Sequence, residues 1–155
     1  MNENRRQTLR AAGGLGLFGA LAAIGLLPDA ALAAGPAAAA WTTKSVADTL
    51  KALGVASTAD SRDIVINAPD IAENGAVVPV GIRSNLPKTE YIALLVEKNP
   101  STLAGAYNLL EGAEADVSMR IKMGQSSDVI AVVKADGKYY TAKKEIKVTL
   151  GGCGG

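Results

Sequence analysis

Across the second half of the chain, apolar and polar residues alternate with a period of two, which predicts β-strands. In the clearest stretch, residues 116–123, the apolar side chains share one face: Val117, Met119, Ile121 and Met123. Further strands are expected at residues 63–67, 77–83, 91–97, 106–110, 128–135 and 140–150. The run at 91–97 is almost entirely apolar, so it fits either a strand buried on both faces or a short helix.

Turn residues separate these segments. Asp136-Gly137 is typical of a two-residue hairpin turn. Pro79 cannot donate a backbone hydrogen bond, so it indicates an edge strand or a bulge within 77–83. The last segment keeps apolar residues at even positions, except that Lys144 interrupts the series.

One short helix is predicted ahead of the strands. Ser45 is a suitable N-cap with Asp48 three residues later, as in a capping box, and Gly54 can end the helix. Its apolar face consists of Val46, Leu50 and Leu53. About seven short strands with regular turns, in a domain of this size, predict an all-β protein: an Ig-like β-sandwich with a short N-terminal helix.

The first 33 residues are expected to be a secretory signal. Arg5 and Arg6 precede a glycine-rich apolar run at 11–27, and small residues follow at 31–33. The paired arginines indicate export by the Tat pathway, which predicts a periplasmic protein. A membrane anchor is the alternative, but the run is short and rich in glycine. The expected organisation is therefore a signal peptide at 1–33, a linker at 34–44, an Ig-like domain at 45–150 and an arm at 151–155.

Composition limits the chemistry available to this chain. With 16 basic and 15 acidic residues, nothing favours nucleic acid or a membrane surface as partner. There is no histidine and only one cysteine, so the chain cannot form a Cys/His zinc site, a Ser-His-Asp or Cys-His catalytic pair, or an internal disulfide. The sequence therefore predicts a non-catalytic protein that binds no cofactor or metal of its own.

The single thiol, Cys153, lies between two pairs of glycines at the C-terminus: Gly151, Gly152, Gly154 and Gly155. Glycine has no preferred backbone conformation, so these residues predict a thin, flexible arm that could enter another protein's active site. Two alternatives remain open at this point. One is a frayed terminus with an incidental cysteine, and the other is an exported structural module tethered by an intermolecular disulfide.

Three stretches and the signal resemble one family. The ending VTLGGCGG, the stretch RIKMGQSSDV at 120–129 and the stretch IAENGAVVPV at 71–80 are similar to SoxY, the sulfur-carrier subunit of the Sox thiosulfate-oxidation system. The resemblance implies that Cys153 covalently holds the pathway's intermediates and that the four glycines form its swinging arm. It also implies a heterodimer with SoxZ, a second Ig-like subunit.

The same resemblance implies a cycle run by partner enzymes. A c-type cytochrome joins thiosulfate to Cys153 as an S-thiosulfonate, and a manganese thiosulfohydrolase then releases sulfate and leaves a persulfide. Where present, a sulfane dehydrogenase oxidises the remaining sulfur. The haem, manganese and molybdenum of this cycle belong to those partners.

Overall fold

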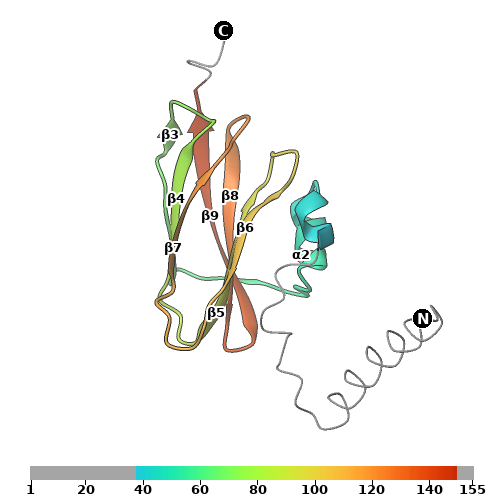
Figure 1. Ribbon diagram of the computed structural model, residues 1–155, viewed down its shortest axis with the longest axis vertical. Helices are drawn as coiled ribbons and strands as arrows, with labels where there is room; N and C mark the ends of the chain where they lie inside the picture. Colours follow the sequence, from blue (N-terminus) through green and yellow to red (C-terminus); the bar gives the residue numbers. More distant parts are fainter. Residues whose placement is uncertain (1–37, 150–155) are drawn as a thin grey trace, which may run out of the picture. The chain divides into compact units, whose positions relative to one another are not determined.

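The computed structural model describes residues 38–149, which form a β-sandwich with a helical segment beside it (Figure 1). The helical segment comprises the 3-10 helix η2 (Ala38–Thr42) and the helix α2 (Val46–Ala52). The strands follow in the order β1 (Ala59–Asp60), β2 (Ile64–Asn67), β3 (Ile71–Ala72), β4 (Val78–Ser84), β5 (Thr89–Val96), β6 (Leu103–Asn108), β7 (Asp116–Ile121), β8 (Ser127–Ala135) and β9 (Lys138–Val148). The predicted all-β sandwich with a short helix ahead of it is confirmed.

The strands form two sheets. The larger sheet has six strands in the order β1-β9-β8-β5-β6, with β3 also paired to β9, and the smaller sheet has the order β2-β4-β7. All pairs are antiparallel, except that β1 and β3 run parallel to β9. The last strand, β9, is therefore internal to the larger sheet, between β8 on one side and β1 and β3 on the other.

The main core lies between the sheets. From the larger sheet it includes Ile92, Leu94 and Val96, and from the smaller sheet Val78, Val80 and Ile82, all at most 1% exposed. The other face of β5 is also covered, because Ala93 and Leu95 belong to a second cluster with residues of the helical segment. The apolar run at 91–97 is thus a strand buried on both faces, and the alternative of a short helix is wrong.

The helix forms as the sequence predicts. The Ser45 hydroxyl accepts a hydrogen bond from the Asp48 backbone N–H at 3.1 Å and donates to the Asp48 carboxylate at 2.7 Å. Beyond the helix, Gly54 adopts a φ of +73°, a conformation that favours glycine. Thr49 is the fully buried residue of this helix, and its hydroxyl donates a hydrogen bond to the Ser45 carbonyl at 2.7 Å.

Two local features refine the sequence prediction. Asp136 and Gly137 have positive φ angles of 49° and 73° in the β8–β9 turn, as the hairpin prediction requires. Pro79 lies in the central strand of the smaller sheet and not in an edge strand, but β2 pairs with β4 only from Gly81 onward. The β2 side of Pro79 is therefore unpaired, which is where a missing N–H is tolerated.

Lys144 interrupts the apolar series of β9 for a structural reason. Its ammonium group donates to the Ala68 carbonyl and lies 3.0 Å from an Asp70 carboxylate oxygen. The lysine therefore fixes the segment between β2 and β3 to the larger sheet. That segment leads into β3, which the sequence analysis missed together with β1, because strands of two residues are too short to show a period.

No helix in the described range 38–149 is long and apolar enough to cross a lipid bilayer.

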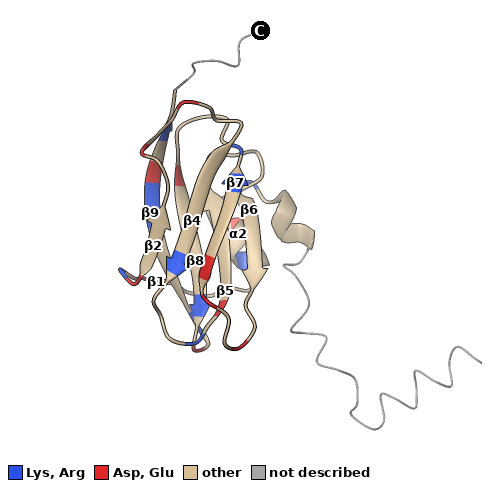
Figure 2. Cartoon of the chain, turned by 60° about the vertical axis from the view of Figure 1, so that its left-hand side comes forward, with Lys and Arg blue, Asp and Glu red and all other residues tan. Residues whose placement is uncertain are grey.

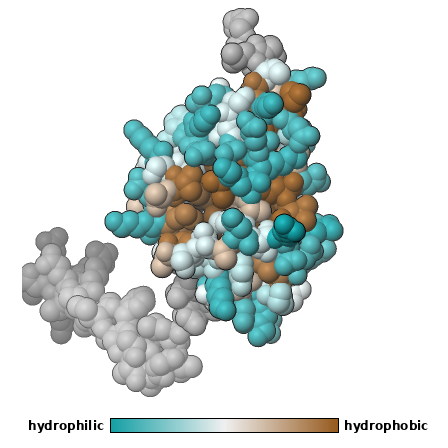
Figure 3. Space-filling view, turned by 180° about the vertical axis from the view of Figure 1, so that it is seen from behind, coloured by the Kyte–Doolittle hydropathy of each residue, from teal (hydrophilic) through white to brown (hydrophobic). Residues whose placement is uncertain are grey.

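Seen from behind, apolar side chains form a band across the middle of the domain, with hydrophilic side chains above and below it (Figure 3).

Burial gives Tyr91 an unusual alkaline titration. Burial raises the pKa of its phenol to about 12 from the ordinary 10.0, with a smaller contribution from Tyr139, and the hydroxyl has no hydrogen-bond partner among the described residues. In the unfolded chain the Tyr91 phenol ionises near pH 10, whereas in the folded protein it stays neutral up to about pH 12. The contribution of the neutral phenol to the free energy of unfolding is therefore complete below pH 10 and is lost between about pH 10 and 12. We expect Tyr91→Phe to leave stability at pH 7 unchanged or slightly higher and to reduce its alkaline loss.

Chemical denaturation at pH 7 and pH 11 checks this prediction, with Tyr107→Phe as the matched control because Tyr107 is 38% exposed. An equal alkaline loss of stability in both variants would contradict it.

Candidate functional site

The described residues end at Thr149, two residues before the predicted arm at 151–155. The arm root comprises residues 71–75, 123–126 and 147–149, which meet at one end of the sandwich. The backbone N–H groups of Lys147 and Thr149 donate to the carbonyls of Asp70 and Ala72 at 2.9 and 3.1 Å. On the other side, the Val148 N–H donates to the Ser126 hydroxyl at 2.9 Å. The chain is therefore held from two sides up to its last described residue.

A close backbone approach completes the arm root. The Met123 N–H donates to the Gly75 carbonyl at 2.7 Å. A Cβ atom on Gly75 would lie 2.3 Å from the Met123 carbonyl oxygen and 2.9 Å from Cγ1 of Val148. Only glycine fits between these two backbones without moving one of them.

The arm root brings together parts of all three stretches that resemble SoxY, since Val148 and Thr149 begin the third of them. Residues 71–80 include β3 and the start of β4, and residues 120–129 include the end of β7 and the start of β8. They are far apart in the sequence and meet through the contact between Gly75 and Met123. Sequence reasoning found both stretches but missed their contact, because nothing in the alternation of residues shows which loops share an end of the sandwich.

The residues proposed to do the chemistry lie beyond the described range. Cys153 and the glycines Gly151, Gly152, Gly154 and Gly155 are outside it, as are Arg5 and Arg6. Cys153 follows Thr149 by four residues, so its Cα can lie at most about 14 Å from that fixed point. The described residues therefore define where the thiol starts from and how far it can reach.

The described residues offer little chemistry of their own. Among residues 38–149, no group of three or more His, Cys, Asp or Glu side chains is placed to hold a metal ion. A hydrogen bond to Asp128 raises the pKa of Lys143, and one to Asp116 raises the pKa of Arg83. Both effects keep a surface cation charged and create neither a base nor a nucleophile.

Gly75→Ala tests the close approach at the arm root. We expect it to destabilise the domain by about 1–3 kcal/mol, the usual cost of overpacking, and to speed hydrogen exchange at the amides of Val148 and Thr149. Gly124→Ala is the matched control, because a Cβ there meets nothing within 4 Å, and its effect should stay within about 0.5 kcal/mol. Equal melting temperatures for the two variants would show that the arm root tolerates a side chain at Gly75.

Fold and site together define a class of protein: a small Ig-like β-sandwich whose C-terminal segment leaves from an internal strand that is fixed on both sides. The family described as sulfur oxidation protein SoxY matches residues 50–153, a range that includes Cys153. The chain belongs to the SoxY family.

A solved structure agrees with this assignment. The sulfur carrier protein SoxY from Chlorobium limicola f thiosulfatophilum is 34% identical, with a TM-score of 0.63, and the alignment covers 70% of this chain and 96% of that chain. The comparison with curated proteins gives no match.

Other solved structures share the fold alone. Superoxide reductase (neelaredoxin) from Ignicoccus hospitalis is 21% identical, with a TM-score of 0.52, over 57% of this chain and 81% of that chain. Its E23A variant is 23% identical, with a TM-score of 0.50, over 64% and 87% of the two chains. The sandwich is therefore found in proteins with a different function, and the function of this chain has to be argued from its own residues.

Proposed function

We propose that this protein is a covalent sulfur carrier in thiosulfate oxidation and that Cys153 is its attachment point. The observation that carries the proposal is the fixed arm root, from which a segment of four glycines and one thiol continues. Membership of the SoxY family supports it, as does the similarity to a protein described as a sulfur carrier. A thiol on a short glycine segment can enter a partner's active site while the sandwich remains outside.

The proposed cycle has two steps on Cys153. The thiolate and thiosulfate join through a new S–S bond, and the two electrons released pass to a partner c-type cytochrome. Water then attacks the terminal sulfonate sulfur in a partner manganese hydrolase, which releases sulfate and leaves a persulfide on Cys153. A sulfane dehydrogenase with molybdenum oxidises the persulfide sulfur further in systems that contain one.

In this proposal the chain is a carrier subunit, and the haem, manganese and molybdenum stay in the partners. The stable partner is a SoxZ-like Ig-like subunit that forms a heterodimer with this chain. The apolar band seen from behind supports such an interface, because extended apolar surface on a soluble domain commonly marks a protein contact (Figure 3).

The mass of the protein purified from thiosulfate-grown cells tests the carrier function. We expect masses that correspond to a thiosulfonate and to a persulfide on Cys153, each removed by dithiothreitol. The contrary result is a protein that contains only a disulfide between two chains, which would support the tether instead. Cells grown without thiosulfate are the control, since the adducts should be absent from them.

We further propose that the protein works in the periplasm after export by the Tat pathway. Changing both Arg5 and Arg6 to Lys should keep the charge of the signal, lose the paired arginines and leave the uncleaved precursor in the cytoplasm. Immunoblots of cytoplasmic and periplasmic fractions measure the distribution. A normal periplasmic yield of this variant would refute the Tat route without touching the carrier function.

A further inference from the structure

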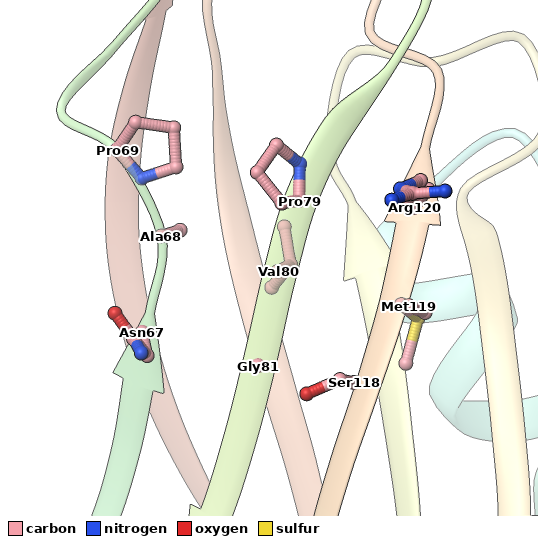
Figure 4. Close-up of a pocket in the computed structure, with 9 residues that line it drawn as sticks. All are labelled: Asn67, Ala68, Pro69, Pro79, Val80, Gly81, Ser118, Met119 and Arg120. Atoms are coloured by element: carbon pink, nitrogen blue, oxygen red, sulfur yellow. The ribbon is translucent and has the colours of Figure 1, made fainter.

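The two sheets differ in what covers their outer faces. The smaller sheet is open: its outer face has a hollow of about 590 Å³ along β4 (Figure 4), and its Arg83–Asp116 ion pair lies on the surface (Figure 2). The larger sheet is covered in part by the helical segment, because Ala40 belongs to the second core cluster together with Ala93 and Leu95 on β5. The helical segment is therefore built into the folded domain.

Side-chain hydroxyls fix the 3-10 helix η2 in place. The Thr43 hydroxyl donates to the Ala40 carbonyl at 2.7 Å, and the Ser101 hydroxyl, from the loop before β6, donates to the Trp41 carbonyl. The Thr102 N–H donates to the Thr43 carbonyl at 3.0 Å. Ala40 itself is 0% exposed. The backbone of η2 is therefore both tied to the start of β6 and packed against the sheet.

The sequence around η2 offers several bonds to a signal peptidase. This enzyme recognises small residues at the first and third positions before the bond that it cuts. Residues 30–43 contain no charge, and alanines two positions apart end at Ala33, Ala39 and Ala40. Composition therefore allows the expected cut after Ala33 and also cuts after Ala39 or Ala40.

The fold separates these bonds into two kinds. A protease cuts backbone that is exposed or that opens locally, so a bond held in folded structure is cut in proportion to how often it opens. The bonds after Ala39 and Ala40 lie inside η2, and cutting the second of them would remove the buried Ala40 from its cluster. To expose either bond, η2 has to leave the sheet and lose the hydrogen bonds made by Thr43 and Ser101.

We propose that η2 sets the limit of signal-peptide processing: its packing withholds the bonds after Ala39 and Ala40, so signal peptidase hydrolyses the chain ahead of Ala38. This inference rests on the proposed export by the Tat pathway, which carries chains that have already folded. Water adds across the cut peptide bond, and the new amino terminus belongs to a chain that keeps all of η2. The helical cover of the larger sheet thus stays complete in every exported molecule.

Blocking the expected site tests the proposal on the full-length precursor. Ala33→Asp puts a charge where a small residue is required and leaves the later alanines unchanged. In this background, Thr43→Val and Ser101→Ala together remove the two hydroxyls that hold η2. N-terminal sequencing and intact mass of the protein from membrane and periplasmic fractions identify the bonds that are cut.

With η2 intact, we expect no chain that begins at Ala40 or Trp41. Release of η2 should raise the rate of cutting at these bonds about five- to hundredfold, the range expected for two lost hydrogen bonds. Ser84→Ala with Thr89→Val is the matched control, because it removes two hydroxyls, from β4 and β5, that bond each other at 2.8 Å. The control should give no chain that begins within η2.

A second precursor separates the fold from the sequence. In it a Sec-type signal replaces residues 1–27, Ala33→Asp is kept, and the chain crosses the membrane before it folds. We expect this precursor to give chains that begin at Ala40 or Trp41 even though η2 is unaltered, because η2 has not yet formed when the peptidase acts.

Either of two results would overturn the inference. One is a chain that begins at Ala40 or Trp41 from the Tat-exported precursor with η2 intact. The other is the absence of such chains from the Sec-type precursor, which would mean that distance from the apolar run selects the bond. Export that survives the change of Arg5 and Arg6 to Lys would instead refute the Tat route, and it is measured by location, whereas the limit set by η2 is measured by the N-terminal residue.

Discussion

Cys153→Ser should abolish thiosulfate-dependent oxygen uptake by the reconstituted system and leave the melting temperature of the domain unchanged. A serine oxygen cannot form the S–S bond that the proposed cycle requires. Position 153 lies beyond Thr149, the last residue held by the described hydrogen bonds, so the change in unfolding free energy should be less than about 0.5 kcal/mol. Calorimetry and oxygen uptake on the same preparation measure the two effects.

A relocated thiol is the control for this variant. Adding Ser57→Cys to Cys153→Ser restores one thiol per chain, but on the exposed loop after α2. We expect no recovery of activity. Recovery would mean that any accessible thiol on the domain suffices, and the argument from the arm root would then fail.

Deleting Gly151 and Gly152 together should slow loading by the proposed partner cytochrome about a hundredfold or more. The deletion withdraws the sulfur by roughly 7 Å, and misplacing a reacting atom by even about 1 Å can cost that much. Alkylation by iodoacetamide should change little, since a small reagent does not need the arm to reach into a partner. The ratio of the enzymatic rate to the alkylation rate is therefore the quantity to measure.

Side-chain variants separate arm length from arm thickness. Replacing Gly151 and Gly152 with two alanines keeps the length and should preserve most of the activity. Gly152→Val and Gly154→Val thicken the tip beside the sulfur and should give intermediate rates. If the deletion leaves both rates unchanged, the glycines are only a frayed end. If both rates fall together in the valine variants, the glycines tune the reactivity of the thiol instead of its reach.

The strands could be predicted where only one face of the sheet is covered, because apolar and polar side chains then alternate along the strand. β7 shows this, since its apolar residues Val117, Met119 and Ile121 face the core and its polar residues face outward. For β5 the sequence predicted a strand but left a short helix open, because the helical segment covers its second face and so removes the alternation. β1 and β3 were missed because they are short and because their pairing with β9 depends on distant residues.

The candidate site, like the strands, could be predicted from the sequence only in part. Local composition predicts the importance of Cys153, because nothing else in the sequence resembles a thiol between glycine pairs. The arm root depends on which loops meet at one end of the sandwich, and that is a property of the topology. Lys144 shows the difference: in the sequence it only interrupts a pattern, whereas in the fold it attaches the segment between β2 and β3 to β9.

The position of β9 also affects how the protein is made. It follows all the other described strands in the chain, yet it pairs with β8, β1 and β3 inside the larger sheet. A nascent chain that stops before residue 138 leaves β8 with an unpaired edge and β1 and β3 without a partner, so it cannot complete the sandwich. The sandwich is therefore complete only when β9 has been synthesised, and Cys153 follows the end of β9 by five residues. Chains whose synthesis stops before β9 could not fold and would also lack Cys153, so their removal as misfolded chains would enrich the folded population in molecules that contain the proposed attachment residue.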